Sequence, residues 1–417
     1  MNTDYVPRLL DKQLASDLST SPAVILEGPR ACGKTETASQ VAASHIFLDD
    51  TSAASNLART QPIAALPGDT PRLLDEWTAI PGLWNEIRHE VDKRRSPGQF
   101  ILTGSANPPA IASRHSGAGR FQHLHLSTMT LLERGLSTGA ASLGDLAKGR
   151  LAPSIGVDVA VTDYTHWIVQ GGWPGFLQLD SLAASRRVAG YVQDLVQHDF
   201  PEVAGMRRDP RRFEAFLRAY AGLVASPATF AAIARRLGED FHLSTTAETV
   251  QLFHDFATRL FVIEDQPPFS PRLRSASSPI QTPKRHFADP SLAAALLQAS
   301  PTRLLADLET LGLLFESLVV HDLRVYAQVA FNGKVTHFRD RKARDEIDIV
   351  LETPEGDWIG IEVKLSHLFV DAAAENLLRV AAKIDPAPAA LAVVIPSGPI
   401  IQRNDGVWVI PLAACGP

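Results

Sequence analysis

The octapeptide Gly28-Pro29-Arg30-Ala31-Cys32-Gly33-Lys34-Thr35 decides the fold of this chain. It matches the phosphate-loop pattern G-x-x-x-x-G-K-[ST] at every fixed position. Its glycines let backbone N–H groups turn inward around phosphates, and the helix that follows directs the positive end of its dipole at them. Lys34 can reach the β- and γ-phosphates, while Thr35 can bind Mg²⁺. The sequence therefore predicts ATP and Mg²⁺ as ligands of this loop, with Glu36 an added acid at the helix start.

The residues around this loop alternate between strand and helix patterns. The apolar run Ala23–Glu27 leads into it, and a helix is expected from Lys34 to about Ala43. Further strands are expected at His45–Asp49, Arg72–Asp75 and Phe100–Gly104, with a helix at Leu83–Arg94. Strands that alternate with helices predict an α/β fold, in which a parallel sheet carries helices on both faces.

Two acids end the strand Arg72–Asp75 and complete the predicted ATP site. We expect Asp75 to hold Mg²⁺ through water and Glu76 to polarise the attacking water. A polar residue after the next strand, Ser105 or Asn107, can touch the γ-phosphate or its water, although a plain turn explains the segment equally well.

Arginines follow in the Gly/Ser-rich stretch 113–120. Arg114 or Arg120, placed against the γ-phosphate of a neighbouring subunit, would stabilise charge in the transition state. This interpretation requires a homo-oligomer. The alternative for each is an ordinary surface arginine.

The rest of the chain predicts two further regions. Residues 164–260 are typical of helices, interrupted at Gly171–Pro174, and Thr229–Leu237 with Thr245–Leu260 suits a helix-turn-helix or winged-helix unit joined through Gly238. The proline- and serine-rich stretch Gln266–Pro283 is expected to be a loop or linker. Helices at Leu292–Ala299 and Arg303–Val325 precede a second α/β unit. We expect three domains: a phosphate-loop core at 1–135, a helical and winged-helix region at 155–265, and a C-terminal α/β domain at 284–417.

The composition excludes several classes of protein. The chain has 417 residues, a formal net charge of −6 and only two cysteines. The negative net charge argues against a protein that binds nucleic acid through an overall basic surface. The two cysteines argue against a fold held together by several disulfides. The first residues lack a secretory apolar core, and apolar runs such as Leu391–Ile395 are too short to cross a bilayer. We therefore expect a cytoplasmic protein without a membrane partner.

The ordered set of these motifs resembles the AAA-superfamily ATPases that carry a C-terminal DUF4143 domain. The resemblance runs over nearly the whole chain and implies an ATPase core, a winged-helix middle and a C-terminal fold like the restriction endonucleases. Trp77 stands where a glutamine is common, and Glu36 replaces a small hydroxyl residue. The matching residues are Gly28–Thr35, Leu73–Glu76, Leu102–Ser105, Gly119-Arg120, Gly171–Pro174, His198-Asp199, Phe315-Glu316, Asp348 and Glu362–Lys364.

A second site is predicted in the C-terminal region. In the hairpin of 346–352 and 358–365, alternation places Asp348, Glu362 and Lys364 on one face, where they can converge. Two carboxylates and a lysine suit metal-assisted phosphodiester hydrolysis, and Glu316 would add a third metal-binding acid. Ordinary cross-strand ion pairs are the alternative.

The nearby basic residues Arg339, Arg341, Lys342 and Arg344 can hold a nucleic-acid backbone. The helix Thr245–Leu260 is a poor reader of bases, because only Arg259 suits that role. The basic run Arg207–Arg212 is a better phosphate contact, although such runs are usually solvated.

Two functions remain open at the level of sequence. The first is an ATP-dependent switch or remodeller that acts on nucleic acid and carries a nuclease-like domain. The second is a non-catalytic scaffold that binds ATP, changes its oligomeric state and recruits a partner.

Overall fold

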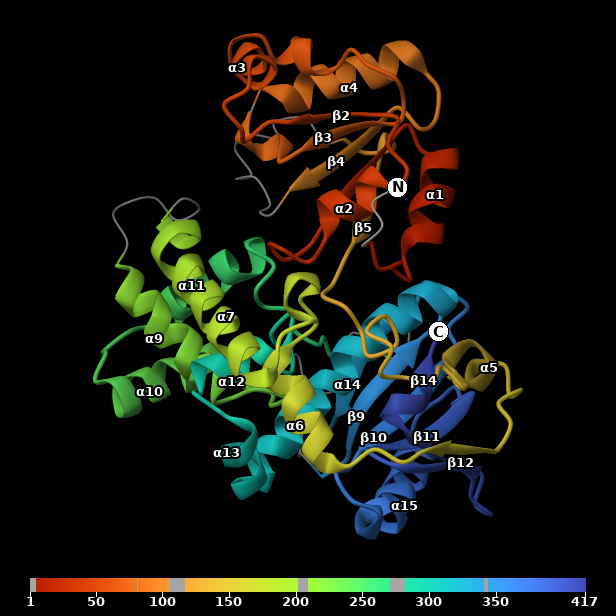
Figure 1. The fold of residues 1–417 in the computed structure, drawn as a ribbon. Helices are drawn as coiled ribbons and strands as arrows, with labels where there is room; N and C mark the ends of the chain where they lie inside the picture. Colours follow the sequence, from red (N-terminus) through yellow and green to blue (C-terminus); the bar gives the residue numbers. More distant parts are fainter. Residues whose placement is uncertain (1–4, 81, 105–116, 202–208, 271–281, 341–343) are drawn as a thin grey trace. The chain divides into compact units, whose positions relative to one another are not determined.

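The chain forms two compact units in the computed structural model, which describes residues 5–417 except 81, 105–116, 202–208, 271–281 and 341–343 (Figure 1). The first unit contains the described residues of 1–128 together with 256–262. The second contains those of 129–201, 206–255 and 263–417.

A five-stranded parallel sheet lies at the centre of the first unit, in the order β2-β3-β4-β1-β5. Its strands are β1 (Ala23–Glu27), β2 (Ser44–Phe47), β3 (Arg72–Asp75), β4 (Phe100–Gly104) and β5 (Phe121–His125). Four of these strands were expected from apolar runs. The fifth was missed because it is an edge strand in which Leu124 alone is fully buried.

Helices cover both faces of this sheet, as predicted (Figure 1). Helices α3 (Ala53–Thr60) and α4 (Leu83–Arg94) close one face over a core that includes Ile25, Leu74 and Leu102. Helices α1 (Asp11–Thr20) and α2 (Lys34–Ser39) pack on the other face. Because both faces are covered, the three central strands β1, β3 and β4 are buried at nearly every position rather than at alternate ones.

The second unit begins with a helical region. Its helices are α5 (Leu143–Ala147), α6 (Val161–Gln170), α7 (Ser181–Asp194), α9 (Pro210–Ala221), α10 (Phe230–Phe241), α11 (Ala247–Arg259), α12 (Pro290–Leu296), α13 (Pro301–Ala306) and α14 (Leu308–Phe331). Two expectations were wrong in detail. Gly238 lies inside α10, and residues 242–246 join α10 to α11. The helix expected over Arg303–Val325 is two helices, because the Asp307 side chain caps α14 by accepting from Thr310 N.

A seven-stranded mixed sheet completes the second unit, in the order β7-β12-β13-β11-β10-β9-β8. Its strands are β7 (Ser154–Val157), β8 (Lys334–Arg339), β9 (Glu346–Glu352), β10 (Trp358–Val363), β11 (Ala390–Ile395), β12 (Gly398–Gln402) and β13 (Trp408–Pro411). The predicted hairpin is the antiparallel pair β9–β10. Helix α15 (Val370–Ala381) packs on this sheet through an apolar face that includes Ala374 and Leu377. The predicted α/β fold class is thereby confirmed.

The stretch expected to be a linker is anchored at both ends. Gln266 is fully buried, and its backbone exchanges hydrogen bonds with that of Lys284 at 2.9 and 3.0 Å. Phe269 belongs to the core of the second unit. The expectation of a linker was therefore wrong for the first residues of this stretch, where Gln266 and Pro268 form isolated β-bridges with Lys284 and His337. Across the described part of the chain, no helix is long and apolar enough to span a membrane.

We predict that Gly172→Ala destabilises the second unit. A Cβ at this position would lie 2.1 Å from the Met129 carbonyl oxygen, and that backbone cannot retreat freely because Met129 N donates to Gly172 O at 2.7 Å. The expected loss is roughly 1–3 kcal/mol in the free energy of unfolding, measured by denaturant titration. The control is Gly190→Ala in α7, where a Cβ meets nothing within 4 Å. It should stabilise the fold by roughly 0.5–1 kcal/mol. Equal effects of the two substitutions would contradict this account.

Candidate nucleotide-binding site

The phosphate loop leaves the carboxyl end of β1 and is held close to the chain after β5. A Cβ on Gly28 would lie 2.1 Å from the Leu126 carbonyl oxygen, so this position requires glycine. The same oxygen accepts from the Cys32 thiol at 3.2 Å. Ala31 and Gly33 have φ of 61° and 103°, which turns the loop back on itself.

The side chains of Lys34 and Thr35 are fixed within the first turn of α2. Lys34 is only 4% exposed, and its ammonium group donates to the carbonyl oxygens of Gly28 and Pro29 at 2.9 and 2.8 Å. Thr35 Oγ1 donates to Asp75 Oδ1 at 2.7 Å. Of the other predicted nucleotide contacts, Arg30 and Glu36 are exposed.

Asp75 has a second hydroxyl partner, to which the sequence analysis gave no role. The strand β4 lies between β1 and β3 in the sheet. Thr103, at the end of β4, donates its hydroxyl to Asp75 Oδ1, the same oxygen that accepts from Thr35. A hydroxyl residue at the end of an apolar strand was the available signal. The residues predicted for this role, Ser105 and Asn107, lie outside the described residues, as does Arg114.

Glu76 follows Asp75 in a left-handed backbone conformation, with φ 51° and ψ 46°. This conformation is uncommon for a non-glycine residue and ends the strand abruptly at the acidic pair. Trp77, one of the two residues that depart from the family pattern, is buried in the core beside Trp84, with a ring-centroid distance of 5.3 Å. Its side chain therefore packs inside the unit.

The N-terminal segment contributes Arg8, which no motif identified. Arg8 is 6% exposed, and its guanidinium donates to the Cys32 carbonyl oxygen and to the Ser127 carbonyl oxygen, both at 2.8 Å. Asp11 orients the segment by accepting from Arg8 N at 2.9 Å and from the Tyr5 hydroxyl at 2.7 Å. Arg8 thus ties the phosphate loop to the chain that leaves β5.

Arg120 lies near the amino-terminal ends of the parallel strands, whereas the phosphate loop of the same chain lies at their carboxyl ends. It precedes Phe121, which is in register with Ala23 at the start of β1. Its guanidinium forms a two-pronged ion pair with Asp92, at 2.6 and 3.0 Å, beside a cavity of about 590 Å³ that Arg95 also lines. A contact with a neighbouring subunit's ATP stays a prediction.

The second predicted site is assembled on β9, β10 and α14. Ile361 pairs with Ile349, so continuing this antiparallel register places Glu362 opposite Asp348. The ammonium group of Lys364 lies 2.6 Å from Glu362 Oε2 and 3.4 Å from Asp348 Oδ2. The predicted convergence of these side chains on one face of the hairpin is present in the structure.

A residue outside all predictions, Lys284, enters the same cluster. Its ammonium group lies 2.9 Å from Glu316 Oε1, 3.1 Å from Asp348 Oδ1 and 3.2 Å from Glu346 Oε1. Its side chain is 2% exposed. Lys284 directly follows the proline-rich stretch, and no motif or spacing in the sequence marks it as part of a site.

Burial and neighbouring charge shift the pKa values of the cluster. Burial raises the pKa of Glu316 to about 7, against the opposing effect of Lys284. Burial and the charge of Asp348 raise the pKa of Glu362 to about 8. Burial alone would lower the pKa of Lys284, but the surrounding carboxylates hold it well above its usual value. The ammonium group of Lys284 is therefore charged at neutral pH.

The two sites differ in how well they suit a metal ion. At the phosphate loop, Thr35, Asp75 and Thr103 bring hydroxyl and carboxylate oxygens together, the donors that Mg²⁺ prefers. In the C-terminal cluster, ammonium groups stand between the carboxylates. Among the described residues, no group of three or more His, Cys, Asp or Glu is arranged to hold a metal. The metal-binding roles of Glu316, Asp348 and Glu362 remain predictions.

Family models match three parts of the chain. An AAA domain model matches residues 20–134, and a domain of unknown function, DUF4143, matches residues 311–415. A further domain of unknown function, DUF8612, matches residues 161–303 between them.

Similar proteins span most of the chain. Uncharacterized proteins of Mycobacterium tuberculosis and Mycobacterium bovis are each 24% identical over 406 residues, which is 96% of this chain and 82% of each relative. Among solved structures, a Walker-type ATPase of Pyrococcus abyssi is 13% identical and covers 71% of this chain and 97% of its own, at a TM-score of 0.45. RuvB of Thermotoga maritima is 15% identical and covers 62% of this chain and 89% of its own, at a TM-score of 0.28.

The family models agree with the geometry described above. The phosphate loop, the acidic strand end and the parallel sheet all lie within the residues that the AAA model matches, and the carboxylate strands β9 and β10 lie within the DUF4143 match. Residues 20–134 therefore match an AAA domain and residues 311–415 match a DUF4143 domain, in the order that the resemblance implied.

Proposed function

We propose that the AAA domain binds and hydrolyses MgATP. The observation that carries the proposal is the hydrogen bond from Thr35 to Asp75, which brings the phosphate loop and the acidic strand end together at the carboxyl edge of the sheet. Ligands of open parallel sheets bind at this edge.

Each side chain of the site has a role in this reaction. Lys34, now bonded to loop carbonyls, exchanges them for the β- and γ-phosphates of ATP. Thr35 and Asp75 would hold Mg²⁺, which neutralises charge on the phosphates when bound. Glu76 orients the attacking water by accepting its hydrogen bond. Arg8 acts as a positioning residue, because it holds the loop through Cys32 O.

We predict that Lys34→Ala weakens ATP binding. The substitution removes the cation that faces the β- and γ-phosphates, and a hydrogen bond to a charged group contributes about 1.5–3 kcal/mol, on the order of ten- to a hundredfold in Kd. Isothermal titration with a slowly hydrolysed ATP analogue measures this change. Lys12→Ala, on the exposed face of α1, is the matched control and should bind as the native chain does. Native affinity in Lys34→Ala would show that ATP does not bind at this loop.

We predict that Glu76→Gln keeps ATP bound but slows its hydrolysis. The carboxamide preserves the shape of the side chain and loses the charge that orients water, so turnover should fall by about 10²-fold. Phosphate release and nucleotide affinity are measured on the same preparations. Glu214→Gln, at an exposed position of α9, should retain native turnover. Undiminished turnover in Glu76→Gln would remove Glu76 from the mechanism.

The scaffold alternative predicts a different outcome of these measurements. In that case the native chain binds ATP and changes its oligomeric state without releasing phosphate above the level of Glu76→Gln. Light scattering with and without nucleotide reports assembly, and the phosphate assay reports hydrolysis. The proposal therefore requires both native turnover and its loss in the variant.

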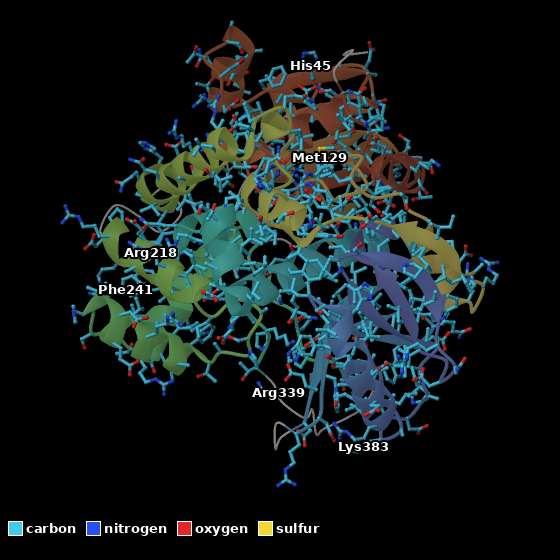
Figure 2. All side chains as sticks on the ribbon, turned by 60° about the horizontal axis from the view of Figure 1, so that its bottom comes forward. His45, Met129, Arg218, Phe241, Arg339 and Lys383 are labelled. Atoms are coloured by element: carbon cyan, nitrogen blue, oxygen red, sulfur yellow. The ribbon has the colours of Figure 1, made fainter. Side chains whose placement is uncertain are left out.

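We further infer that the C-terminal domain contacts a nucleic-acid backbone. What supports this proposal is a group of basic side chains at one end of the second unit, where Figure 2 labels Arg339 and Lys383. Arg379 of α15 and Lys383, which follows the end of that helix, both pair with Asp345, the residue after the exposed Arg344. Lysine and arginine contacts to phosphates make such binding depend on salt.

We predict that the double substitution Arg344→Ala and Lys383→Ala reduces the salt dependence of binding to DNA or RNA. The slope of log K against log salt should fall by about one for each phosphate contact removed. Fluorescence anisotropy with labelled single- and double-stranded oligonucleotides measures the slope. Arg186→Ala with Arg187→Ala, on an exposed part of α7, removes the same charge elsewhere. An unchanged slope, or the same change in the control pair, would count against this surface.

A further inference from the structure

Lys284 places a buried positive charge in the middle of the carboxylates that suggested a nuclease. We propose that Lys284 is the built-in cation of this cluster and takes the place of a divalent metal ion, so that the DUF4143 domain acts as a binding module without metal-dependent cleavage. This inference concerns a different domain from the ATP site and is independent of ATP hydrolysis.

The geometry on one side of Asp348 leaves no position for a metal. The nitrogen of Lys284 lies 2.9–3.2 Å from oxygens of Glu316, Glu346 and Asp348. A divalent ion bound to the same oxygens would sit at about 2.0–2.6 Å from each. The point that is close to all of these oxygens is the place where the ammonium group stands. Lys284 and a metal ion therefore compete for one position.

The second carboxylate oxygen of Asp348, Oδ2, is also occupied by hydrogen-bond donors of the protein. This oxygen accepts from the backbone N–H of Val363 at 3.1 Å and from Lys364 at 3.4 Å. Glu362 directs Oε2 to Lys364 at 2.6 Å and Oε1 to the Asn376 amide at 3.2 Å. Both carboxylates of the predicted metal pair thus have their oxygens engaged by the protein's own donors. Lys364 alone would leave Asp348 Oδ1 open, and Lys284 fills that remaining place.

The charges of the cluster explain why a cation is required there. Carboxylates of Glu316, Glu346 and Asp348 repel one another in a site where water screens them poorly. A buried charge is tolerated when it is paired and hydrogen-bonded. Lys284 meets this condition with its three carboxylate contacts, and it lowers the repulsion among them.

Lys284 is anchored by its backbone and cannot swing aside freely. Lys284 N donates to Gln266 O, and Gln266 N donates to Lys284 O, at 3.0 and 2.9 Å. The Gln266 amide in turn donates to the carbonyl oxygens of Thr336 on β8 and Asp348 on β9, at 2.8 and 3.0 Å. These bonds fix the backbone of Lys284 to the sheet, and burial of its side chain leaves the ammonium group little room to rotate away. The amine, which lies within the DUF8612 match, is thus a fixed part of the carboxylate cluster of the DUF4143 match.

The test is a titration of nucleotide-free protein with Mn²⁺, in which electron paramagnetic resonance reports the free ion. The native chain, Asp348→Asn, Lys284→Ala, Lys284→Arg and the double variant Lys284→Ala with Asp348→Asn are compared. Because the phosphate loop is intact in all of them, Mn²⁺ bound there cancels in the comparison.

We expect the native chain and Asp348→Asn to bind equal amounts of Mn²⁺. Lys284→Ala should gain one bound Mn²⁺ per chain, the double variant should lose it, and Lys284→Arg should gain none, because the larger cation keeps the place filled. A folded Lys284→Ala that gains no Mn²⁺ would overturn the proposal. A bound Mn²⁺ in the native chain that disappears in Asp348→Asn would overturn it as well.

The proposal stays testable if Lys284→Ala does not fold. The native chain and Asp348→Asn still decide it, because equal Mn²⁺ binding supports an amine-filled cluster and one ion fewer in Asp348→Asn refutes it. Nuclease assays with Mg²⁺ and Mn²⁺ provide a second readout. Cleavage by the native chain that Asp348→Asn abolishes, while ATP hydrolysis persists, would show a working metal site.

Discussion

The hydrogen bond between Thr35 and Asp75 is the contact on which the nucleotide site depends. It spans the sheet from the loop after β1 to the end of β3, with Thr103 of the intervening β4 bonded to the same carboxylate oxygen. Parallel strands end at one edge, so residues far apart in the chain meet there. Arg8 adds a second restraint by fixing the loop from the side of Cys32.

The two buried lysines Lys34 and Lys284 differ in the groups that accept hydrogen bonds from their ammonium groups. Lys34 is bonded to carbonyl oxygens of its own loop, which are neutral partners that phosphate oxygens can replace. Lys284 is bonded to carboxylates that are themselves buried, so the attraction between opposite charges in a poorly screened site adds to its hydrogen bonds. The first lysine can therefore exchange its partners for a ligand. The second holds a charged cluster together.

Sequence patterns located most of the elements that position these sites. The strands Ala23–Glu27, Arg72–Asp75 and Phe100–Gly104 and the hairpin strand Glu346–Glu352 have the predicted bounds, because apolar runs and alternation mark buried strands directly. The expectations failed where tertiary contacts override composition. Gln266 and Phe269 lie in a proline-rich stretch yet are buried, and Asp307 divides a continuous helical pattern by capping α14.

The sequence by itself determined the phosphate loop, the acidic strand end and the convergence of Asp348, Glu362 and Lys364, because each follows from local spacing and the period of a helix or strand. Only the tertiary structure decided that β4 lies between β1 and β3 with Thr103 bonded to Asp75, and that Lys284 enters the carboxylate cluster. Strand order and the approach of distant side chains depend on how the elements pack, and no local pattern records that.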